Sequence, residues 1–349
     1  MPVATTRPLV PGVWAPIPTF FDANEEIDVP TFVAHTVRLA QAKMNPVICG
    51  SMGEAHHLTN EERTTLIKAA RKGLDEAGLN DATIIAGTGV GSTKGSIQLS
   101  KEAAEAGADF AIVIPSGYYA GALGREALKQ YFVDVAEASP IPVMVYNFPG
   151  AAGGIDMDSD LIIDIAKGSS NICGVKLTCG AVGKLTRITA ATTSDEFKRD
   201  YPRRNPQAPF LTLGGFADFM LPTVLGGKAH GAIMGLGNVY PHALAQLYYG
   251  SADLLNETPR ASLAEMTRLQ GLASEADWAF VAAGIAGTKY YLQQTRGYGG
   301  VCRLPILPFP EDKGAKLLKD DRVNQFMEVE KKLEAQAKGS KVNGSTNGH

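Results

Sequence analysis

The sequence is poor in cysteine, carries no large excess of charge of one sign, and contains no apolar run long enough to cross a membrane. Its four cysteines, Cys49, Cys173, Cys179 and Cys302, form no CxxC pairs and no metal-ligand spacing with histidine, which argues against disulfides and against a zinc site. The 33 Lys and Arg against 36 Asp and Glu give a net charge of −3, so no basic field exists to hold nucleic acid or an anionic membrane. We therefore expect free thiols in a reducing compartment, and no nucleic-acid or membrane partner.

The two ends of the chain are short of apolar residues. Residues 1–11 contain no apolar signal core and are expected to form an N-terminal arm. Their one arginine gives little support to a transit peptide, so we predict a cytoplasmic protein, with mitochondria as the alternative. Residues 337–349 are mostly small and polar, which predicts a disordered tail.

Short apolar runs rich in β-branched residues dominate the first two thirds of the chain. They lie at 13–21, 46–51, 83–90, 110–116, 142–148, 172–178, 210–215 and 231–237. Continuous apolar runs with little alternation are typical of strands buried on both faces, as in a parallel sheet. Helix signals separate the runs, for example Asn60 as an N-cap before EERTTLIKAARKGL. Eight strand–helix units predict an α/β fold, a (β/α)8 TIM barrel. An open doubly wound sheet is the alternative, but no GxGxxG follows the first run.

After about residue 240 the pattern becomes helical only. We therefore divide the chain into the N-terminal arm, a barrel over 12–255, a C-terminal helical extension over 256–336, and the tail. A polar insertion at 192–207, between the sixth and seventh runs, contains prolines and charges and is predicted to be a surface excursion.

Lys176 is the first candidate for chemistry, because active sites in such barrels lie at the C-terminal ends of the strands. It stands between Val175 and Leu177 in the sixth run. Burying an ammonium is costly unless it is paired or loses its proton, and a neutral amine attacks a ketone. The resulting iminium withdraws electrons, so that a neighbouring C–C bond breaks without a metal or an organic cofactor. The alternative is a strand-end lysine whose charged head reaches solvent.

Two further strand ends carry candidate groups. Tyr146, in the fifth run, stands one strand–helix unit before Lys176, and its phenol could relay protons there; the alternative is a core tyrosine with a satisfied hydroxyl. The loop GSMGE (50–54) could offer backbone N–H groups to a substrate carboxylate, or it is an ordinary turn. We interpret Glu54 as an acid at a helix start that interacts with its own turn.

Four motifs in series resemble one family. GSMGE (50–54), PSGYY (115–119), YNFPG (146–150) and GVKLTCG (174–180) resemble, in this order, the dihydrodipicolinate synthase/N-acetylneuraminate lyase family of class I aldolases and related lyases. The resemblance covers about residues 12–310. Within the family, GYGGVCRLPI (297–306) looks like the 4-hydroxy-2-oxoglutarate aldolase branch, and the insertion looks like the branch that cleaves 2-keto-3-deoxy sugar acids.

The resemblance implies roles for single residues. Lys176 would be the Schiff-base lysine and Tyr146 the proton donor and acceptor. The other implied residues are Ser51 and Met52 at the substrate carboxylate, Thr178, Gly215 and Ile233 beside the substrate, and Tyr119 at a contact with a neighbouring subunit. It further implies no cofactor, no metal, a small 2-oxo acid as substrate, and a homo-oligomer, either a dimer or a tetramer.

Departures from the family pattern narrow the reaction. Dihydrodipicolinate synthases usually carry an arginine two residues after the proline of the fifth-strand motif, where this chain has Ala151 after Pro149. Without that guanidinium a second substrate carboxylate loses a bidentate partner. We therefore predict an aldolase that cleaves a 4-hydroxy-2-oxo acid to pyruvate and an aldehyde. The alternatives are a synthase or dehydratase acting on the same imine, and, because Met52 cannot pass a proton, a non-catalytic binding relative.

Overall fold

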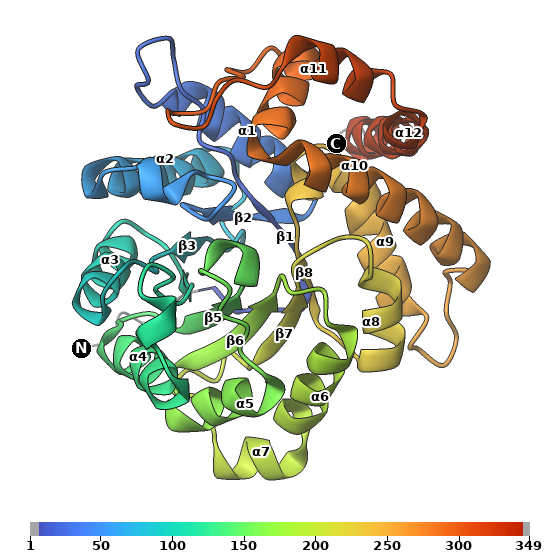
Figure 1. The fold of residues 1–349 in the computed structure, drawn as a ribbon. Coiled ribbons are helices and arrows are strands. Elements are labelled where there is room, and N and C mark those ends of the chain that lie inside the picture. Colours follow the sequence, from blue (N-terminus) through green and yellow to red (C-terminus); the bar gives the residue numbers. More distant parts are fainter. Residues whose placement is uncertain (1–6, 345–349) are drawn as a thin grey trace.

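The computed structural model describes residues 7–344, and its centre is a closed barrel of eight parallel strands in chain order (Figure 1). The strands are β1 Gly12–Pro16, β2 Met44–Ile48, β3 Ile85–Gly87, β4 Phe110–Val113, β5 Val143–Asn147, β6 Ile172–Leu177, β7 Leu211–Gly214 and β8 Gly231–Ile233. Each lies within or overlaps one of the eight apolar runs. The predicted (β/α)8 barrel is therefore confirmed, and β1 pairs with β8, which rules out the open sheet.

Helices surround the strands on the outside (Figure 1). They are α1 Val29–Gln41, α2 Asn60–Glu76, α3 Thr93–Glu105, α4 Arg125–Ala138, α5 Ser159–Gly168, α6 Val182–Thr193, α7 Asp195–Asp200, α8 Met220–Gly227 and α9 Pro241–Asp253. The N-cap of α2 is Thr59 and not Asn60, because Thr59 and Glu62 form a capping box. Glu62 N donates to Thr59 Oγ1 at 3.2 Å, and Thr59 N donates to Glu62 Oε2 at 2.8 Å.

The N-terminal end of the barrel is closed by two segments. Leu9 of the arm is buried against the inward-facing barrel residues, and its N–H donates to Gln207 O at 2.8 Å. Within the insertion, which contains α7, the guanidinium of Arg203 donates to the carbonyl oxygens of Ser169 and Ile172 below β6. The insertion thus connects α6 to β7 at the N-terminal end of the barrel. The candidate residues gather at the opposite end, at the C-termini of the strands.

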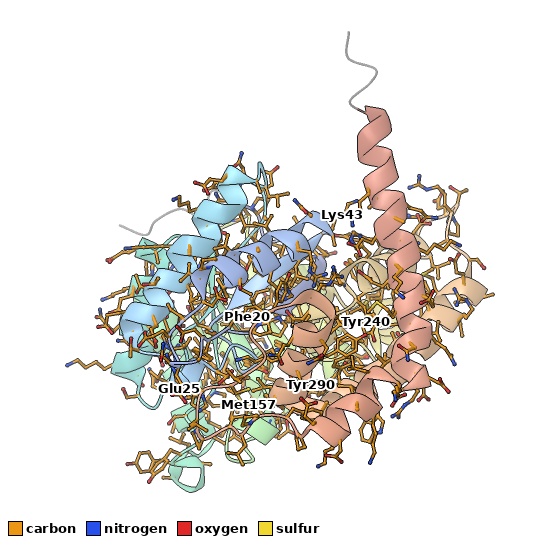
Figure 2. The ribbon with its side chains drawn as sticks, turned by 90° about the horizontal axis from the view of Figure 1, so that it is seen from above. Phe20, Glu25, Lys43, Met157, Tyr240 and Tyr290 are labelled. Carbon is orange, nitrogen blue, oxygen red and sulfur yellow. The ribbon has the colours of Figure 1, made fainter. Side chains whose placement is uncertain are left out.

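The C-terminal region is helical, with α10 Leu263–Arg296, α11 Glu311–Leu318 and α12 Asp321–Gly344. Helix α12 lies along one side of the molecule (Figure 2). The ring of Tyr240, labelled in Figure 2, packs against Phe326 of α12 with ring centroids 4.8 Å apart. α12 runs on to Gly344 and so includes the first part of the tail that the sequence predicts over 337–349; 345–349 lie outside the described residues. Within 7–344, every helix is too short or too polar to cross a membrane.

Helix α10 is bent at Gly284, where φ is 65° and ψ is −159°. A residue with a Cβ would be strained in this conformation, whereas glycine adopts it readily. The bend separates a first half, Leu263 to Ala283, from a second half that returns toward the barrel. The sequence predicts the first half as a helix but carries no clear helical signal for the second.

Glu330 of α12 makes the stability of the fold depend on pH. Its buried carboxylate accepts from the backbone N–H groups of His242 and Ala243 at the start of α9, at 3.2 and 2.8 Å, and burial raises its pKa to about 7. Because this pKa lies above the ordinary value of 4.5, the folded state binds more protons than the unfolded state between the two values. The contribution of Glu330 to the free energy of unfolding is therefore expected to fall as pH rises through this window.

The test is Glu330→Gln, which keeps an acceptor for α9 but cannot ionise. Urea denaturation from about pH 5 to about pH 8 should show a shallower loss of stability in the variant than in the unaltered protein. Parallel curves for the two proteins would assign the pH dependence to other groups.

Candidate active site

A cavity of about 520 Å³ lies at the C-terminal ends of the strands. Its walls come from the loops after the strands and from the middle of α10. The lining includes Ser51, Met52, Tyr146, Lys176, Thr178, Gly215, Asp277, Phe280 and Thr288. Most of the residues predicted from the sequence therefore meet in one place, although they come from four different strands or their loops.

Lys176 and Tyr146 are direct neighbours. They stand opposite each other in the β5–β6 pairing, and Lys176 Nζ donates to Tyr146 Oη at 3.2 Å and lies 4.2 Å from the centre of its ring. Only 5% of Lys176 and 7% of Tyr146 are exposed. Within residues 7–344 the lysine forms no ion pair, so no carboxylate holds its amine away from the cavity. An unpaired amine next to a phenol is suited to attack a carbonyl carbon and to exchange protons with the adduct.

The GSMGE loop presents free backbone donors to this cavity. The N–H groups of Gly53, Glu54 and Ala55 bond to carbonyl oxygens within the loop, at 3.1 to 3.2 Å. Those of Ser51 and Met52 have no acceptor in the described part of the chain. Successive free N–H groups at a loop form a concave site for an anion. The arrangement fits the carboxylate site expected there.

Glu54 contacts residues far from it in the chain, in addition to its own turn. Its carboxylate does contact its own turn, through His57 Nδ1 at 3.1 Å, but it also accepts from Lys289 Nζ at 2.8 Å and from Arg303 N at 2.9 Å. The interpretation of Glu54 as a purely local acid is therefore wrong. The residue instead ties the carboxylate-site loop to α10 and to the segment that follows it, both more than 200 positions away in the chain.

Thr178 and Gly215 form one side of the cavity. Thr178 is part of the cavity lining, and its buried hydroxyl has no hydrogen-bond partner among the described residues. Gly215 lies directly against it: a Cβ at this position would stand 2.1 Å from Thr178 Oγ1 and 2.6 Å from Thr178 Cα. Rotation of the hydroxyl relieves the first contact but not the second, because Cα belongs to the backbone.

Gly215→Ala is accordingly expected to displace Thr178 and to lower kcat/KM about 10-fold or more, since a displacement of about 1 Å at a reacting site is costly. The measurement is steady-state kinetics alongside a thermal melt. Gly226→Ala is a matched control on α8, because an added Cβ there meets no atom within 4 Å. Equal activity in the two variants would remove Gly215 from the site.

Two predicted residues lie elsewhere. Ile233 is fully buried among the inward-facing barrel side chains, and it is not among those that line the cavity. Its place beside the substrate stays a prediction. Tyr119 is 62% exposed in the loop after β4, edge-on to Tyr118 with ring centroids 5.0 Å apart. It does not line the cavity of its own chain, and its contact with a neighbouring subunit stays a prediction.

Helix α10 adds residues to the site that the sequence analysis does not identify. Asp277 lines the cavity with a carboxylate that accepts from Ala217 N at 2.7 Å and from Asp218 N at 3.2 Å. Burial raises the pKa of this carboxyl to about 7, and the nearby Asp218 carboxylate acts in the same direction. An acid within the apolar helical stretch ASEADWAF was the one available signal.

Comparison with known proteins gives this arrangement a context. Residues 11–321 match the model of the dihydrodipicolinate synthetase family. The L-threo-3-deoxy-hexylosonate aldolase of Aspergillus niger is 41% identical over 338 residues, 93% of this chain and 98% of the relative. The "Probable 4-hydroxy-2-oxoglutarate aldolase, mitochondrial" of Emericella nidulans is 40% identical over 332 residues, 95% and 99% of the two chains.

A solved structure extends the comparison to three dimensions. YagE, a prophage protein of the dihydrodipicolinic acid synthase family from E. coli K12, solved in complex with pyruvate, has a TM-score of 0.77 at 26% identity, with 91% of this chain and 99% of that chain covered. Both the family model and the two curated relatives span most of the chain. The chain therefore belongs to the dihydrodipicolinate synthetase family.

Proposed function

We propose that this protein is a class I aldolase that cleaves a 4-hydroxy-2-oxo acid to pyruvate and an aldehyde. The substrate would be a 2-keto-3-deoxy sugar acid such as L-threo-3-deoxy-hexulosonate, or 4-hydroxy-2-oxoglutarate. The observation that carries the proposal is the buried amine of Lys176, 3.2 Å from the phenol oxygen of Tyr146 in the wall of a cavity. The two aldolases that resemble this chain over more than nine tenths of its length support the same reaction.

The first step forms an imine. The neutral amine of Lys176 attacks C2 of the substrate and gives a carbinolamine. Tyr146 donates its phenol proton to the departing hydroxyl, which leaves as water, and the nitrogen lone pair closes the iminium. Tyr146 is then a phenolate close to the iminium that it helped to form. The free N–H groups of Ser51 and Met52 would hold the substrate carboxylate during this step.

The second step breaks the C3–C4 bond. The phenolate of Tyr146 accepts the proton of the C4 hydroxyl, the aldehyde forms at C4, and the bonding electrons pass to the iminium to give an enamine. Protonation of C3 and addition of water to the renewed iminium then release pyruvate and restore the amine. These steps use one acid–base group, Tyr146, and one electron sink, the iminium on Lys176. Met52 therefore does not need to carry a proton.

The cavity favours aldol cleavage over lysine-precursor synthesis. Ala151 is part of its lining, and no arginine of residues 7–344 is, so a second carboxylate finds no guanidinium of the described chain there. The alternative of a synthase or dehydratase on the same imine is tested by product analysis with pyruvate plus glyceraldehyde, glyoxylate or aspartate semialdehyde. A non-catalytic relative would bind a 2-oxo acid without forming an imine.

Borohydride trapping tests the proposal directly. The protein is incubated with pyruvate, reduced with borohydride, digested and analysed by mass spectrometry. We expect an adduct on Lys176 with the mass of pyruvic acid less one oxygen atom, because reduction fixes the imine as a secondary amine. An unmodified Lys176, or an adduct on another lysine, contradicts the mechanism.

Assembly and compartment are further proposals. We expect a homodimer or homotetramer, with Tyr119 at a subunit contact, since 62% of this large aromatic side chain is exposed in the single chain. Light scattering after size-exclusion chromatography would measure the oligomer. A cytoplasmic location is proposed, with mitochondria as the alternative because the name of the Emericella relative places that protein there.

A further inference from the structure

Asp277 has one carboxyl oxygen in use and one that is free. Its Oδ2 accepts both backbone N–H groups, from Ala217 and from Asp218. Its Oδ1 has no partner within residues 7–344, and it is not among the unpaired polar atoms that are wholly enclosed by protein. Because only 4% of the residue is exposed and it lines the cavity, the free oxygen faces the cavity.

This oxygen is isolated in an apolar wall. Phe280 and Val281, one helical turn beyond Asp277, also line the cavity, as does Phe216 next to Ala217. No lysine, arginine or histidine of the described chain forms an ion pair with Asp277. A buried polar atom without a partner is costly, and a hydrogen-bonding ligand removes that cost. The buried carboxyl, with its pKa raised to about 7 chiefly by desolvation, can accept a hydrogen bond when ionised and donate one when protonated.

A hydroxyl group matches both states, because it is a donor and an acceptor, whereas a carboxylate is an acceptor only and is repelled by an ionised Asp277. The basic side chains that line the cavity, Lys176, His56 and His57, are poor partners for a second substrate carboxylate. Lys176 would be consumed in the imine, and His57 is bonded to Glu54. Burial, with Arg63 and His57 nearby, lowers the pKa of His56 and favours its neutral form.

We propose that Asp277 is a specificity-determining residue, whose free oxygen binds a hydroxyl of the aldehyde half of the substrate. The protein would then prefer 2-keto-3-deoxy sugar acids, whose aldehyde half is a polyol, to 4-hydroxy-2-oxoglutarate, whose aldehyde half carries a carboxylate. This inference deepens the proposed function and rests on it. It requires the C–C cleavage on Lys176 but selects between the two substrate classes that the relatives represent.

The experiment compares kcat/KM for L-threo-3-deoxy-hexulosonate and for 4-hydroxy-2-oxoglutarate. We expect the unaltered protein to favour the sugar acid. In Asp277→Asn, which removes the charge and retains an acceptor for Ala217 and Asp218, the ratio should shift toward 4-hydroxy-2-oxoglutarate by about 10-fold or more. In Asp277→Leu the sugar acid should lose about 10-fold or more, mainly through a higher KM, because no hydrogen bond replaces the lost one.

A matched control and a separate readout isolate the cause. Asp218→Asn removes the neighbouring carboxylate, which does not line the cavity, and should leave the ratio unchanged. Borohydride trapping of pyruvate on Lys176 should proceed equally in the unaltered protein and in Asp277→Asn, because pyruvate lacks the aldehyde half. An unchanged ratio in both Asp277 variants, or an equal shift in Asp218→Asn, overturns this inference. Failure of trapping in the unaltered protein instead overturns the proposed function.

Discussion

Replacing Lys176 with alanine is expected to lower kcat/KM for aldol cleavage by about 10⁴-fold or more, and to leave the melting temperature unchanged or higher. Without the amine no iminium forms, and the electrons of the breaking C3–C4 bond have no acceptor. The stability expectation follows from the lack of an ion-pair partner for Lys176 in the described chain. Because no buried carboxylate is left unpaired, the usual penalty for removing one charge of a pair does not arise.

Lys184 provides the matched control. It is also largely buried, on α6, but its amine pairs with the carboxylate of Asp156. Lys184→Met should therefore lower stability and retain imine formation, the reverse of Lys176→Ala. Kinetics, borohydride trapping and thermal melts are measured on both variants. One variant should lose activity and keep its stability, and the other should lose stability and keep imine formation. A general folding defect cannot produce these opposite results. Cleavage activity in Lys176→Ala within about 100-fold of the unaltered protein would show that the lysine is misassigned.

The pairing of Lys176 with Tyr146 is predictable because it depends on local spacing. Each strand–helix unit of a barrel returns the chain to the next strand in register, so strand-end residues one unit apart become neighbours. The eight apolar runs were visible for a related reason: strands buried on both faces need apolar residues at nearly every position. The β5–β6 register places these two side chains opposite each other, as the unit spacing predicts.

Depth within the barrel is less visible in the sequence. The family resemblance implies that Ile233 lies beside the substrate, but the apolar run GAIMGLG does not distinguish the layer that lines the cavity from the layer beneath it. The tilt and stagger of the strands decide that, and both are set by the closure of the whole barrel. Ile233 therefore packs with the interior side chains, while Gly235, two residues further on, reaches the cavity.

The contribution of α10 could not be predicted, because it depends on contacts between distant parts of the chain. Gly284 bends the helix within a stretch of small and apolar residues, AFVAAGIAG, which has no distinctive turn signal. The bend brings Asp277 from one half and Lys289 from the other to the barrel mouth. Hydrophobic periodicity reports which face of a helix is buried, and it carries no information on which distant residue that face will meet.

The buried pair of Glu54 and Lys289 leads to the second large expected effect. Both side chains are 0% exposed, and Nζ lies 2.8 Å from Oε1. Either Glu54→Ala or Lys289→Ala leaves the other group buried without its partner, which should lower the free energy of unfolding by about 3–5 kcal/mol. Burial already lowers the pKa of Lys289, and Glu54 opposes that change, so loss of the glutamate favours loss of the lysine's proton.

A double-variant cycle separates the pair from its surroundings. Glu54→Gln keeps one acceptor oxygen, which can replace Oε2 as the partner of Arg303 N and His57, and Lys289→Met keeps the length of the side chain. We expect the double variant to be more stable than the Lys289→Met single variant, because it contains no unpaired buried charge. Urea denaturation gives the coupling energy. Lys331→Met, in the exposed pair with Glu328, is the matched control and should cost less than about 1 kcal/mol.

The same cycle reports on catalysis, because Glu54 closes the loop whose free N–H groups face the substrate carboxylate. Weakening its contact with α10 should loosen that loop and raise KM for the 2-oxo acid more than it lowers kcat, since Lys176 and Tyr146 are held by β5 and β6 and not by the loop. If the single variants lose stability with KM unchanged, the pair supports the fold alone. If kcat falls and KM does not, Glu54 acts on the reacting atoms, and the positioning role argued from its contacts is wrong.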